Sequence, residues 1–295
     1  MRHFLELDEL KPADLAELLD LCRPERAEPV LAGRGAALIF EKPSNRTRNS
    51  SEMAVVGLSG HPVYIRGEEI GMGRRESIDD ITRVLARYHA LVAARVFDHR
   101  HLEEMAAVDQ VPIVNLLSDS GHPIQILADF LTLQQRWGDL EGRSLAWVGD
   151  GNNVARSLVF GAALAGVNVR LACPPGHWLD PVTVDAARSA GVEILETDRP
   201  EEAVAGADAV YTDVWVSMGQ EDEAAARTDA FAGYMVTTDL MAGAADGALF
   251  LHCLPAHRGL EVEAAVIDGP ASVVWDQAEN RMHSARAVFQ WLITQ

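Results

Sequence analysis

Residues 144–172, with the sequence SLAWVGDGNNVARSLVFGAALAGVNVRLA, predict a strand, a helix and a second strand in direct succession. Residues 144–148 and 167–172 are short apolar runs of strand length, whereas residues 153–165 have the length and composition of a helix. Two strands joined through a helix pair in parallel, because the crossover returns the chain to the same end of the sheet. The stretch therefore indicates an α/β fold.

The same alternation continues on both sides of this unit. Before it we expect strands at 36–40, 62–65, 90–97 and 111–117, with helices at 45–58, 77–88 and 123–137. After it we expect helices at 181–190 and 201–205, strands at 192–195, 209–212 and 249–251, and a final helix at 278–293. The two series predict two doubly wound parallel-sheet domains, with the active site in the interdomain cleft.

The break in the pattern at 138–142 (GDLEG) sets the expected domain boundary. We assign residues 1–137 and the C-terminal helix, about 278–295, to the first domain and residues 138–277 to the second. A chain of 295 residues suits two domains of roughly 100–200 residues each. No apolar run approaches the roughly 20 residues of a membrane helix, and residues 1–21 are interpreted as an amphipathic helix rather than a signal peptide.

Cysteine usage and charge restrict the class of protein. The chain has three cysteines, Cys22, Cys173 and Cys253, at spacings that favour neither a disulfide framework nor a metal site, so we expect a cytoplasmic protein. The net charge of −19 disfavours nucleic acid and anionic membranes as partners. If such a chain binds an anionic substrate, its arginines must be concentrated at one site.

A candidate phosphate site follows the strand expected at 36–40. Pro43 ends the strand, and Ser44 can cap a helix whose first turn holds Asn45, Arg46 and Thr47. A helix N-terminus with hydroxyl and guanidinium groups suits a phosphate dianion. A capped helix followed by a solvated basic turn is the alternative.

A second candidate segment is 122–125, which follows the strand expected at 111–117. His122 and Gln125 share one helical face after Pro123, and both can donate to a carbonyl oxygen that becomes an oxyanion. A histidine that only caps the helix is the alternative. Arg95, at the end of its strand, would by itself be an unremarkable surface arginine.

Three further segments lie at predicted strand ends in the second series. The turn 149–153 (GDGNN) is similar to a dinucleotide-binding turn, so a nicotinamide-dependent oxidoreductase is an alternative, although Val154 replaces the third glycine. In 213–220, Trp215 and Met218 are expected to be exposed on a loop that closes over a ligand, or else to pack on the core, and Asp213 can pair with an ammonium. In 252–255 (HCLP), Cys253 is either an inert core residue or part of a site.

Together with residues 279–281 (ENR), these segments resemble, in order, the motifs of the aspartate/ornithine carbamoyltransferase family, and 213–220 and 252–255 resemble its ornithine branch. The resemblance implies transfer of a carbamoyl group from carbamoyl phosphate to the side-chain amine of ornithine, giving citrulline and phosphate. It also implies a role in arginine metabolism, synthetic or degradative, no metal or organic cofactor, and a homotrimer or multiple of trimers. Putrescine or N-acetylornithine as the amine, and a non-catalytic binding protein, are the alternatives.

The resemblance also implies the site residues. Those implied for carbamoyl phosphate are Ser44, Asn45, Arg46, Thr47, Arg95, His122, Gln125, Cys253, Leu254 and Arg281. Those implied for ornithine are Asn153, Asp213, Ser217 and Met218, and the catalytic residues are Arg46, His122, Cys253 and Arg281. The sequence departs from the family at Asn45, where threonine is usual, and at Gly71, where ornithine enzymes often have glutamine or histidine; Arg74 and Arg75 could supply donors instead.

Overall fold

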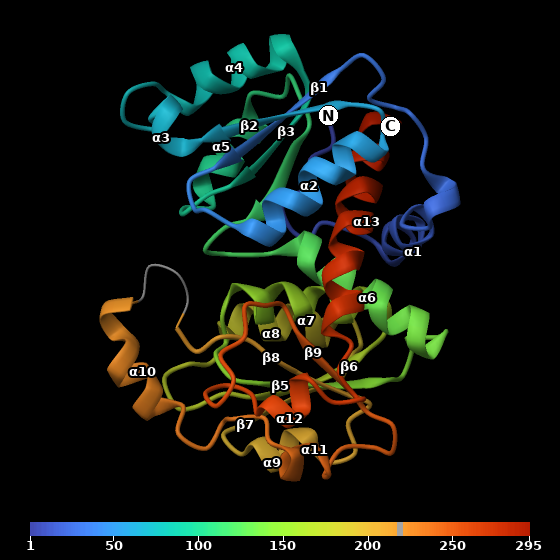
Figure 1. Ribbon diagram of the computed structural model, residues 1–295, viewed down its shortest axis with the longest axis vertical. Helices are drawn as coiled ribbons and strands as arrows, with labels where there is room; N and C mark the ends of the chain where they lie inside the picture. Colours follow the sequence, from blue (N-terminus) through green and yellow to red (C-terminus); the bar gives the residue numbers. More distant parts are fainter. Residues whose placement is uncertain (217–220) are drawn as a thin grey trace. The chain divides into compact units, whose positions relative to one another are not determined.

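The computed structural model describes residues 1–216 and 221–295, and the chain forms two compact units (Figure 1). Unit 1 comprises residues 1–131 and 279–295, and unit 2 comprises residues 132–278. A four-stranded and a five-stranded sheet, in which every paired strand is parallel, confirm the predicted class of two parallel-sheet α/β domains. Within the described residues, no helix has both the length and the apolar character that a membrane span requires.

The sheet of unit 1 has the order β2-β1-β3-β4. Its strands are β1 (Gly35–Phe40), β2 (His61–Arg66), β3 (His89–Arg95) and β4 (Ile113–Leu117). Its helical elements are α1 (Pro12–Leu21), η1 (Pro24–Arg26), α2 (Asn45–Gly57), α3 (Gly67–Ile70), α4 (Ile78–Tyr88), α5 (Arg100–Ala107), the first part of α6 (Pro123–Trp137) and the last part of α13 (Val274–Ile293).

The core on one face of this sheet follows the strand alternation of two. Ala37 and Ile39 of β1 point to this face, where Ile81 of α4 and Leu102 of α5 cover them. Figure 1 shows α2 and α13 on the other side of the sheet from α4. The short apolar strands are therefore buried on both sides, which explains why they are nearly uninterrupted hydrophobic runs.

The predicted N-terminal helix is right only for its second half. Residues 1–11 precede α1 and are not helical, and Phe4 forms an isolated parallel bridge with Val114 of β4. The Phe4 N–H donates to the carbonyl of Ile113 at 2.8 Å, and its carbonyl accepts from Asn115 at 2.8 Å. Pro12 occupies the first helical position, where its missing N–H costs nothing, so the helix begins there.

A buried arginine of α13 satisfies the carbonyl groups at the end of α1. Arg286 is 7% exposed and donates to the carbonyls of Leu21, Cys22 and Arg23 at 3.1, 2.6 and 2.7 Å. A helix leaves its last carbonyls without intrahelical partners, so this guanidinium closes both the helix and the turn after it.

We expect Arg286→Met to lower the free energy of unfolding by about 2–4 kcal/mol, because one buried and two part-buried carbonyls lose their charged donor. Thermal unfolding followed by circular dichroism should show the midpoint falling by about 5–10 °C. Arg83→Met is the matched control, since Arg83 only forms an exposed ion pair with Asp79 on α4 and should change stability by less than about 1 kcal/mol. Equal shifts for the two variants would contradict this account of Arg286.

The sheet of unit 2 has the order β7-β6-β5-β8-β9. Its strands are β5 (Ser144–Val148), β6 (Asn168–Ala172), β7 (Ile194–Thr197), β8 (Ala209–Thr212) and β9 (Leu249–His252). Besides the remaining turns of α6 and α13, its helical elements are α7 (Asn153–Ala165), α8 (Pro181–Ser189), α9 (Pro200–Val204), η2 (Glu221–Glu223), α10 (Ala224–Ala230), α11 (Thr238–Met241) and α12 (Ala264–Ile267).

Helices cover both faces of this second sheet. Figure 1 shows α7 and α8 on one face and α9, α11 and α12 on the other. On the second face, Ala146 and Val148 of β5 join a core with Val204 of α9 and Ile267 of α12. Burial on both faces again accounts for the apolar strand sequences.

The strand order of each sheet reverses at one point, and ligands of doubly wound sheets bind where this happens. In unit 1 the reversal lies between β1 and β3. The segment 41–48 follows β1, and Arg95 is the last residue of β3. In unit 2 it lies between β5 and β8, which are followed by the turn 149–153 and by Asp213. The predicted site segments therefore follow the strands at both reversal points.

Candidate active site

The first turn of α2 is built as the sequence predicted. Ser44 is the N-cap residue, and its Oγ accepts from the backbone N–H of Thr47 at 3.3 Å. The Oγ of Ser44 also lies 3.1 Å from Oγ1 of Thr47, so the cap fixes the threonine hydroxyl. The cap leaves the helix N-terminus, with its partial positive charge, at the carboxyl end of β1.

Two buried arginines from distant parts of the chain meet at the hydroxyl of Thr47. Arg281 of α13, which is 3% exposed, donates to Oγ1 of Thr47 at 2.6 Å, and Arg95 of β3 donates to the same atom at 3.3 Å. The guanidinium of Arg281 also lies 3.5 Å from Nε2 of His122. Four predicted residues of unit 1, Thr47, Arg95, His122 and Arg281, thus form one cluster.

The cluster is strongly electropositive. The pKa of His122 lies well below its usual value, first because the ring is buried and then because Arg281, Arg95 and Arg46 repel a further positive charge. His122 is therefore a neutral imidazole at physiological pH. In a chain of net charge −19, three guanidinium groups near one histidine are the concentrated positive potential that an anionic ligand needs.

The lowered pKa of His122 predicts how stability depends on pH. The unfolded chain binds a proton with the ordinary histidine pKa of 6.5, whereas the pKa in the folded chain is lower. The stability that depends on neutral His122 is therefore present above that pH and is lost below it. Between pH 7.5 and 5.5, we expect wild type to lose about 1 kcal/mol more unfolding free energy than His122→Gln. Urea unfolding at both pH values measures this, and equal losses would contradict it.

Other residues near the phosphate segment have different roles. Arg48 is exposed, forms an ion pair with Glu52 at 2.8 Å and lies over the Tyr64 ring, so it does not join the cluster. Asn45 accepts from the Asn49 amide at 2.9 Å, one helical turn further on. This exposed side-chain pair shows how asparagine is accommodated at the position where threonine is usual.

Gly71 has a conformational reason to be glycine. It ends α3 with φ of 59° and ψ of 43°, in the left-handed region, and an added Cβ would lie 2.7 Å from the Cβ of Arg75. Arg75 donates to the carbonyl of Glu69 at 2.7 Å. A glutamine or histidine at position 71 would therefore require a different path for this segment.

Gln125 lies inside unit 1 and is fully buried. Its Nε2 donates to Asp129 at 2.8 Å, one turn along α6. Among the residues that the structure describes, its Oε1 has no hydrogen-bond partner. A buried amide oxygen of this kind can accept from an N–H group of a ligand.

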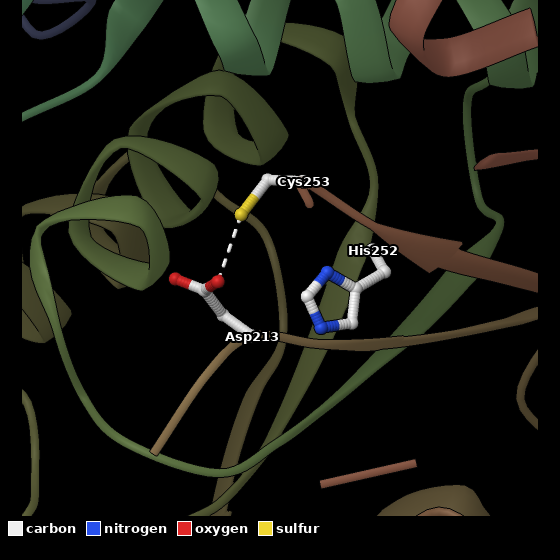
Figure 2. Close-up of side chains that lie close together, drawn as sticks. All are labelled: Asp213, His252 and Cys253. Atoms are coloured by element: carbon white, nitrogen blue, oxygen red, sulfur yellow. Dashed lines mark hydrogen bonds between the residues drawn. The ribbon is translucent and has the colours of Figure 1, made fainter. Parts of the chain in front are cut away.

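In unit 2, a second cluster surrounds the carboxylate of Asp213, which follows β8. The Cys253 thiol donates to Oδ1 at 2.8 Å (Figure 2), the Val214 N–H donates to Oδ1 at 2.8 Å, and the Asn152 amide donates to Oδ2 at 2.9 Å. Asp213 is mostly buried, at 7% exposure. The arrangement holds a fixed negative charge at the reversal point of this sheet.

Asn152 is a member of this cluster that the sequence prediction missed. It is the N-cap of α7, where its Oδ1 accepts from the backbone of Val154 and Ala155 at 2.9 and 3.1 Å while its amide reaches Asp213. The available signal was an asparagine directly before an apolar helix. The predicted residue, Asn153, is the first residue of α7 and is half-buried.

The segment after Asp213 differs from its predicted form. Trp215 is buried rather than exposed, and its ring stacks on Phe231 at 5.7 Å between centroids. Arg227 of α10 donates to the Trp215 carbonyl and forms a buried ion pair with Asp150. The predicted ligands Ser217 and Met218 lie outside the described residues.

The glycine turn after β5 is not available to a pyrophosphate. The Gly151 N–H donates to the His177 carbonyl at 2.8 Å, and an added Cβ would lie 2.6 Å from the Leu179 nitrogen. Gly151 is thus required because another backbone segment packs against it. This use of the turn argues against the nicotinamide alternative, which needs a glycine turn open to the cofactor.

Asp213, His252 and Cys253 place possible metal-ligating atoms within 4.8 Å of one another (Figure 2). Both ring nitrogens of His252 are already engaged, because Nδ1 accepts from the Leu254 N–H at 2.8 Å and Nε2 lies 3.2 Å from Glu261. A metal ligand needs a ring nitrogen with its lone pair available. The residues fit a hydrogen-bonded cluster better than a metal centre.

Comparison with known proteins identifies both halves of the chain. Residues 2–135 match the model "Aspartate/ornithine carbamoyltransferase, carbamoyl-P binding domain", and residues 141–292 match "Aspartate/ornithine carbamoyltransferase, Asp/Orn binding domain". An ornithine carbamoyltransferase of Acidothermus cellulolyticus is 48% identical over 99% of this chain and 97% of its own.

Solved structures show the same likeness. The ornithine carbamoyltransferase of Pyrococcus furiosus has a TM-score of 0.95 and 40% identity, covering 99% of this chain and 97% of its own. An acetylornithine transcarbamylase complexed with acetylcitrulline has a TM-score of 0.89 at 30% identity and covers 100% of both chains. The chain therefore belongs to the aspartate/ornithine carbamoyltransferase family.

Proposed function

We propose that this protein transfers the carbamoyl group of carbamoyl phosphate to the side-chain amine of ornithine, giving citrulline and phosphate. The observation that carries the choice of amine is the buried carboxylate of Asp213, held by Cys253 and Asn152 at the sheet reversal of unit 2. A fixed anion suits the α-ammonium of ornithine. It is unsuited to the second carboxylate of aspartate, which would need a cation at this place.

The phosphate half of the site is assigned to unit 1. Ser44, Asn45, Arg46, Thr47, Arg95, His122, Gln125 and Arg281 bind carbamoyl phosphate in this proposal. The support is the buried cluster in which Arg95 and Arg281 both donate to Thr47 beside neutral His122. Guanidinium groups and a helix N-terminus are the usual partners of a phosphate dianion.

The amine half is assigned to unit 2. Asn153, Asp213, Ser217 and Met218 bind ornithine, and Cys253 and Leu254 contact the carbamoyl group. The Cys253 thiol needs no covalent role, because the amine itself can attack the carbonyl carbon. Its position against Asp213, at 2.8 Å, links the carbamoyl contact to the amino-acid contact.

The reaction then needs only proton loss, positioning and charge stabilisation. The neutral amine attacks the carbonyl carbon, the carbonyl oxygen becomes an oxyanion, and the C–O bond to phosphate breaks as the amine passes a proton to the departing phosphate. Arg46, His122 and Arg281 stabilise the oxyanion and the departing phosphate. The rate rises with pH as the side-chain ammonium of ornithine, with a pKa near that of lysine, about 10, loses its proton.

We extend the proposal to assembly and location. The protein forms a homotrimer or a multiple of trimers in the cytoplasm and acts in arginine metabolism. Support comes from the family to which the chain belongs. Light scattering on the purified protein measures the assembly, and a monomer at micromolar concentration would contradict it.

The function is tested by ureido-product formation from carbamoyl phosphate with ornithine, putrescine, N-acetylornithine and aspartate assayed side by side. N-acetylornithine is included because an acetylornithine transcarbamylase is among the similar structures. We expect ornithine to be preferred by at least about a hundredfold, the value of one charged contact. Preference for N-acetylornithine or aspartate would overturn the role of Asp213, because neither offers it the α-ammonium and side-chain length of ornithine. Preference for putrescine, which lacks only the carboxylate, would overturn the role of Asn153, and no product from any amine would overturn the reaction.

A further inference from the structure

A buried carboxylate, that of Glu261, supports the turn that carries Cys253 and Leu254. Glu261 is not among the residues proposed to bind either substrate. Glu261, in the segment between β9 and α12, is fully buried. Its Oε1 accepts from the His257 N–H at 2.5 Å and lies 3.2 Å from Nε2 of His252, which is itself 1% exposed. Removing a carboxylate from water costs free energy, so a carboxylate buried to this degree normally has a specific structural or functional role.

The hydrogen bonds define the state of His252. The Oε1 atom of Glu261 already accepts from the His257 N–H, so it faces His252 as an acceptor, and Nε2 of His252 carries the proton. The backbone N–H of Leu254 can only donate, so Nδ1, at 2.8 Å, is the unprotonated nitrogen. The ring is thus held in one tautomer and one orientation by two partners with opposite requirements.

Leu254 is a residue whose backbone needs such support. Its φ of 59° is in the left-handed region, which a side chain with a Cβ disfavours. His252 holds the N–H of this residue, and Cys253, the residue between them, donates its thiol to Asp213 at 2.8 Å. The turn is therefore held at Leu254 through the imidazole and at Cys253 through the carboxylate of Asp213.

We propose that Glu261 is a positioning residue for carbamoyl transfer, which acts through His252 to hold the Cys253–Leu254 turn in its working geometry. The expected effect on kcat rests on the proposed function, whereas the expected effect on the geometry of the turn does not. The feature that matters is an acceptor oxygen at the Oε1 position, because both side-chain hydrogen bonds of Glu261 use that atom, whereas Oε2 lies 3.7 Å from Nδ1 of the exposed His257, beyond hydrogen-bond distance. Negative charge is not required, so glutamine can replace glutamate and aspartate, one methylene shorter, cannot.

The kinetic test compares three substitutions at this position. Glu261→Gln keeps the acceptor, Glu261→Asp keeps the charge but withdraws the oxygen, and Glu261→Leu removes both. We expect Glu261→Gln to keep kcat within about threefold of wild type, and Glu261→Asp and Glu261→Leu to lower kcat by about 30–100-fold. The KM for carbamoyl phosphate should change by less than about threefold, since the turn contacts only the neutral carbamoyl group and the charged phosphate is held by the cluster in unit 1.

A second readout needs no substrate. Iodoacetamide alkylation of the thiols, resolved by peptide mapping, reports the environment of Cys253, because Cys22 and Cys173 are buried. We expect the alkylation rate at Cys253 to change by at least about fivefold in Glu261→Asp and Glu261→Leu, and to remain at the wild-type value in Glu261→Gln. This result is independent of whether ornithine, another amine or no amine is the substrate.

Glu263→Gln is the matched control. Glu263 lies two residues further along, is half-exposed, and accepts from the backbone N–H and hydroxyl of Thr238 at 2.8 and 3.0 Å. Its substitution should leave both readouts unchanged. If Glu261→Leu does not fold, the comparison of Glu261→Gln with Glu261→Asp tests the proposal. A higher kcat in Glu261→Asp than in Glu261→Gln would overturn it, and so would wild-type kcat and alkylation rates in both variants.

Discussion

Arg281→Met should lower kcat/KM for carbamoyl phosphate by about a thousandfold, the effect of removing a buried charged donor from a phosphate site. Arg281 donates to Thr47 at 2.6 Å and lies beside His122, so its guanidinium is at the centre of the cluster in unit 1. Methionine fills a similar volume without charge or donors. Steady-state kinetics at saturating ornithine, together with calorimetric titration of carbamoyl phosphate, measures the loss.

Arg281→Lys separates charge from geometry in the same experiment. Lysine keeps a positive charge but lacks the planar fork of donors, so an intermediate loss of about ten- to a hundredfold is expected. Arg48→Met is the control, since Arg48 is exposed and tied to Glu52, and it should stay within about threefold of wild type. A carbamoyl phosphate affinity that survives in Arg281→Met would remove this arginine, and the cluster around it, from the phosphate site.

The fold could be predicted because it depends on local patterns. Strands such as Ser144–Val148 and Ala209–Thr212 are bounded in the structure where their apolar runs begin and end. Ser44 caps α2 and Ser77 caps α4, as the residue types indicate. Parallel sheets buried on both faces make their strands the clearest signal in an α/β sequence.

Most short helices gave no usable pattern, although the five-residue α9 (Pro200–Val204) was predicted. The sequence prediction did not include α11 (Thr238–Met241) or α12 (Ala264–Ile267), which have four residues each, or α10 (Ala224–Ala230), which has seven. A helix needs about two turns before its apolar residues show a period of 3.6. Residues 1–11 failed for a different reason, because Phe4 is recruited by Val114, far along the chain.

The site was predictable only where a motif carries it. The residues of the phosphate segment are adjacent in the sequence and can be recognised together. Arg95 and Arg281 both contact Thr47, but they lie 48 and 234 residues from it along the chain. Glu261 is one of 44 acidic residues in the sequence, and only its burial against His252 distinguishes it from the rest. Contacts of this kind depend on tertiary packing, which one sequence does not display.

Asp213→Asn should lower kcat/KM for ornithine by about a hundred- to a thousandfold, because the α-ammonium loses its charged partner. The amide also disturbs the existing cluster. Both carboxylate oxygens of Asp213 now accept hydrogen bonds, from Cys253 and Val214 on one side and from Asn152 on the other. The Nδ2 of asparagine would face one of these donors, so the thiol and the cap of α7 are affected together.

The ratio of two amines isolates the charge from this disturbance. N-acetylornithine has no α-ammonium, so only the altered hydrogen bonds of the cluster affect its turnover. Its kcat/KM should fall by about tenfold or less. The preference for ornithine over N-acetylornithine should therefore decrease by about ten- to a hundredfold in Asp213→Asn. Asp208→Asn is the control, because Asp208 lies at the opposite end of β8, bonded to Arg143 and Ser144, and should leave the preference unchanged. An unchanged preference in Asp213→Asn would show that the carboxylate does not bind the α-ammonium. Its role would then be limited to accepting hydrogen bonds from Cys253 and Asn152.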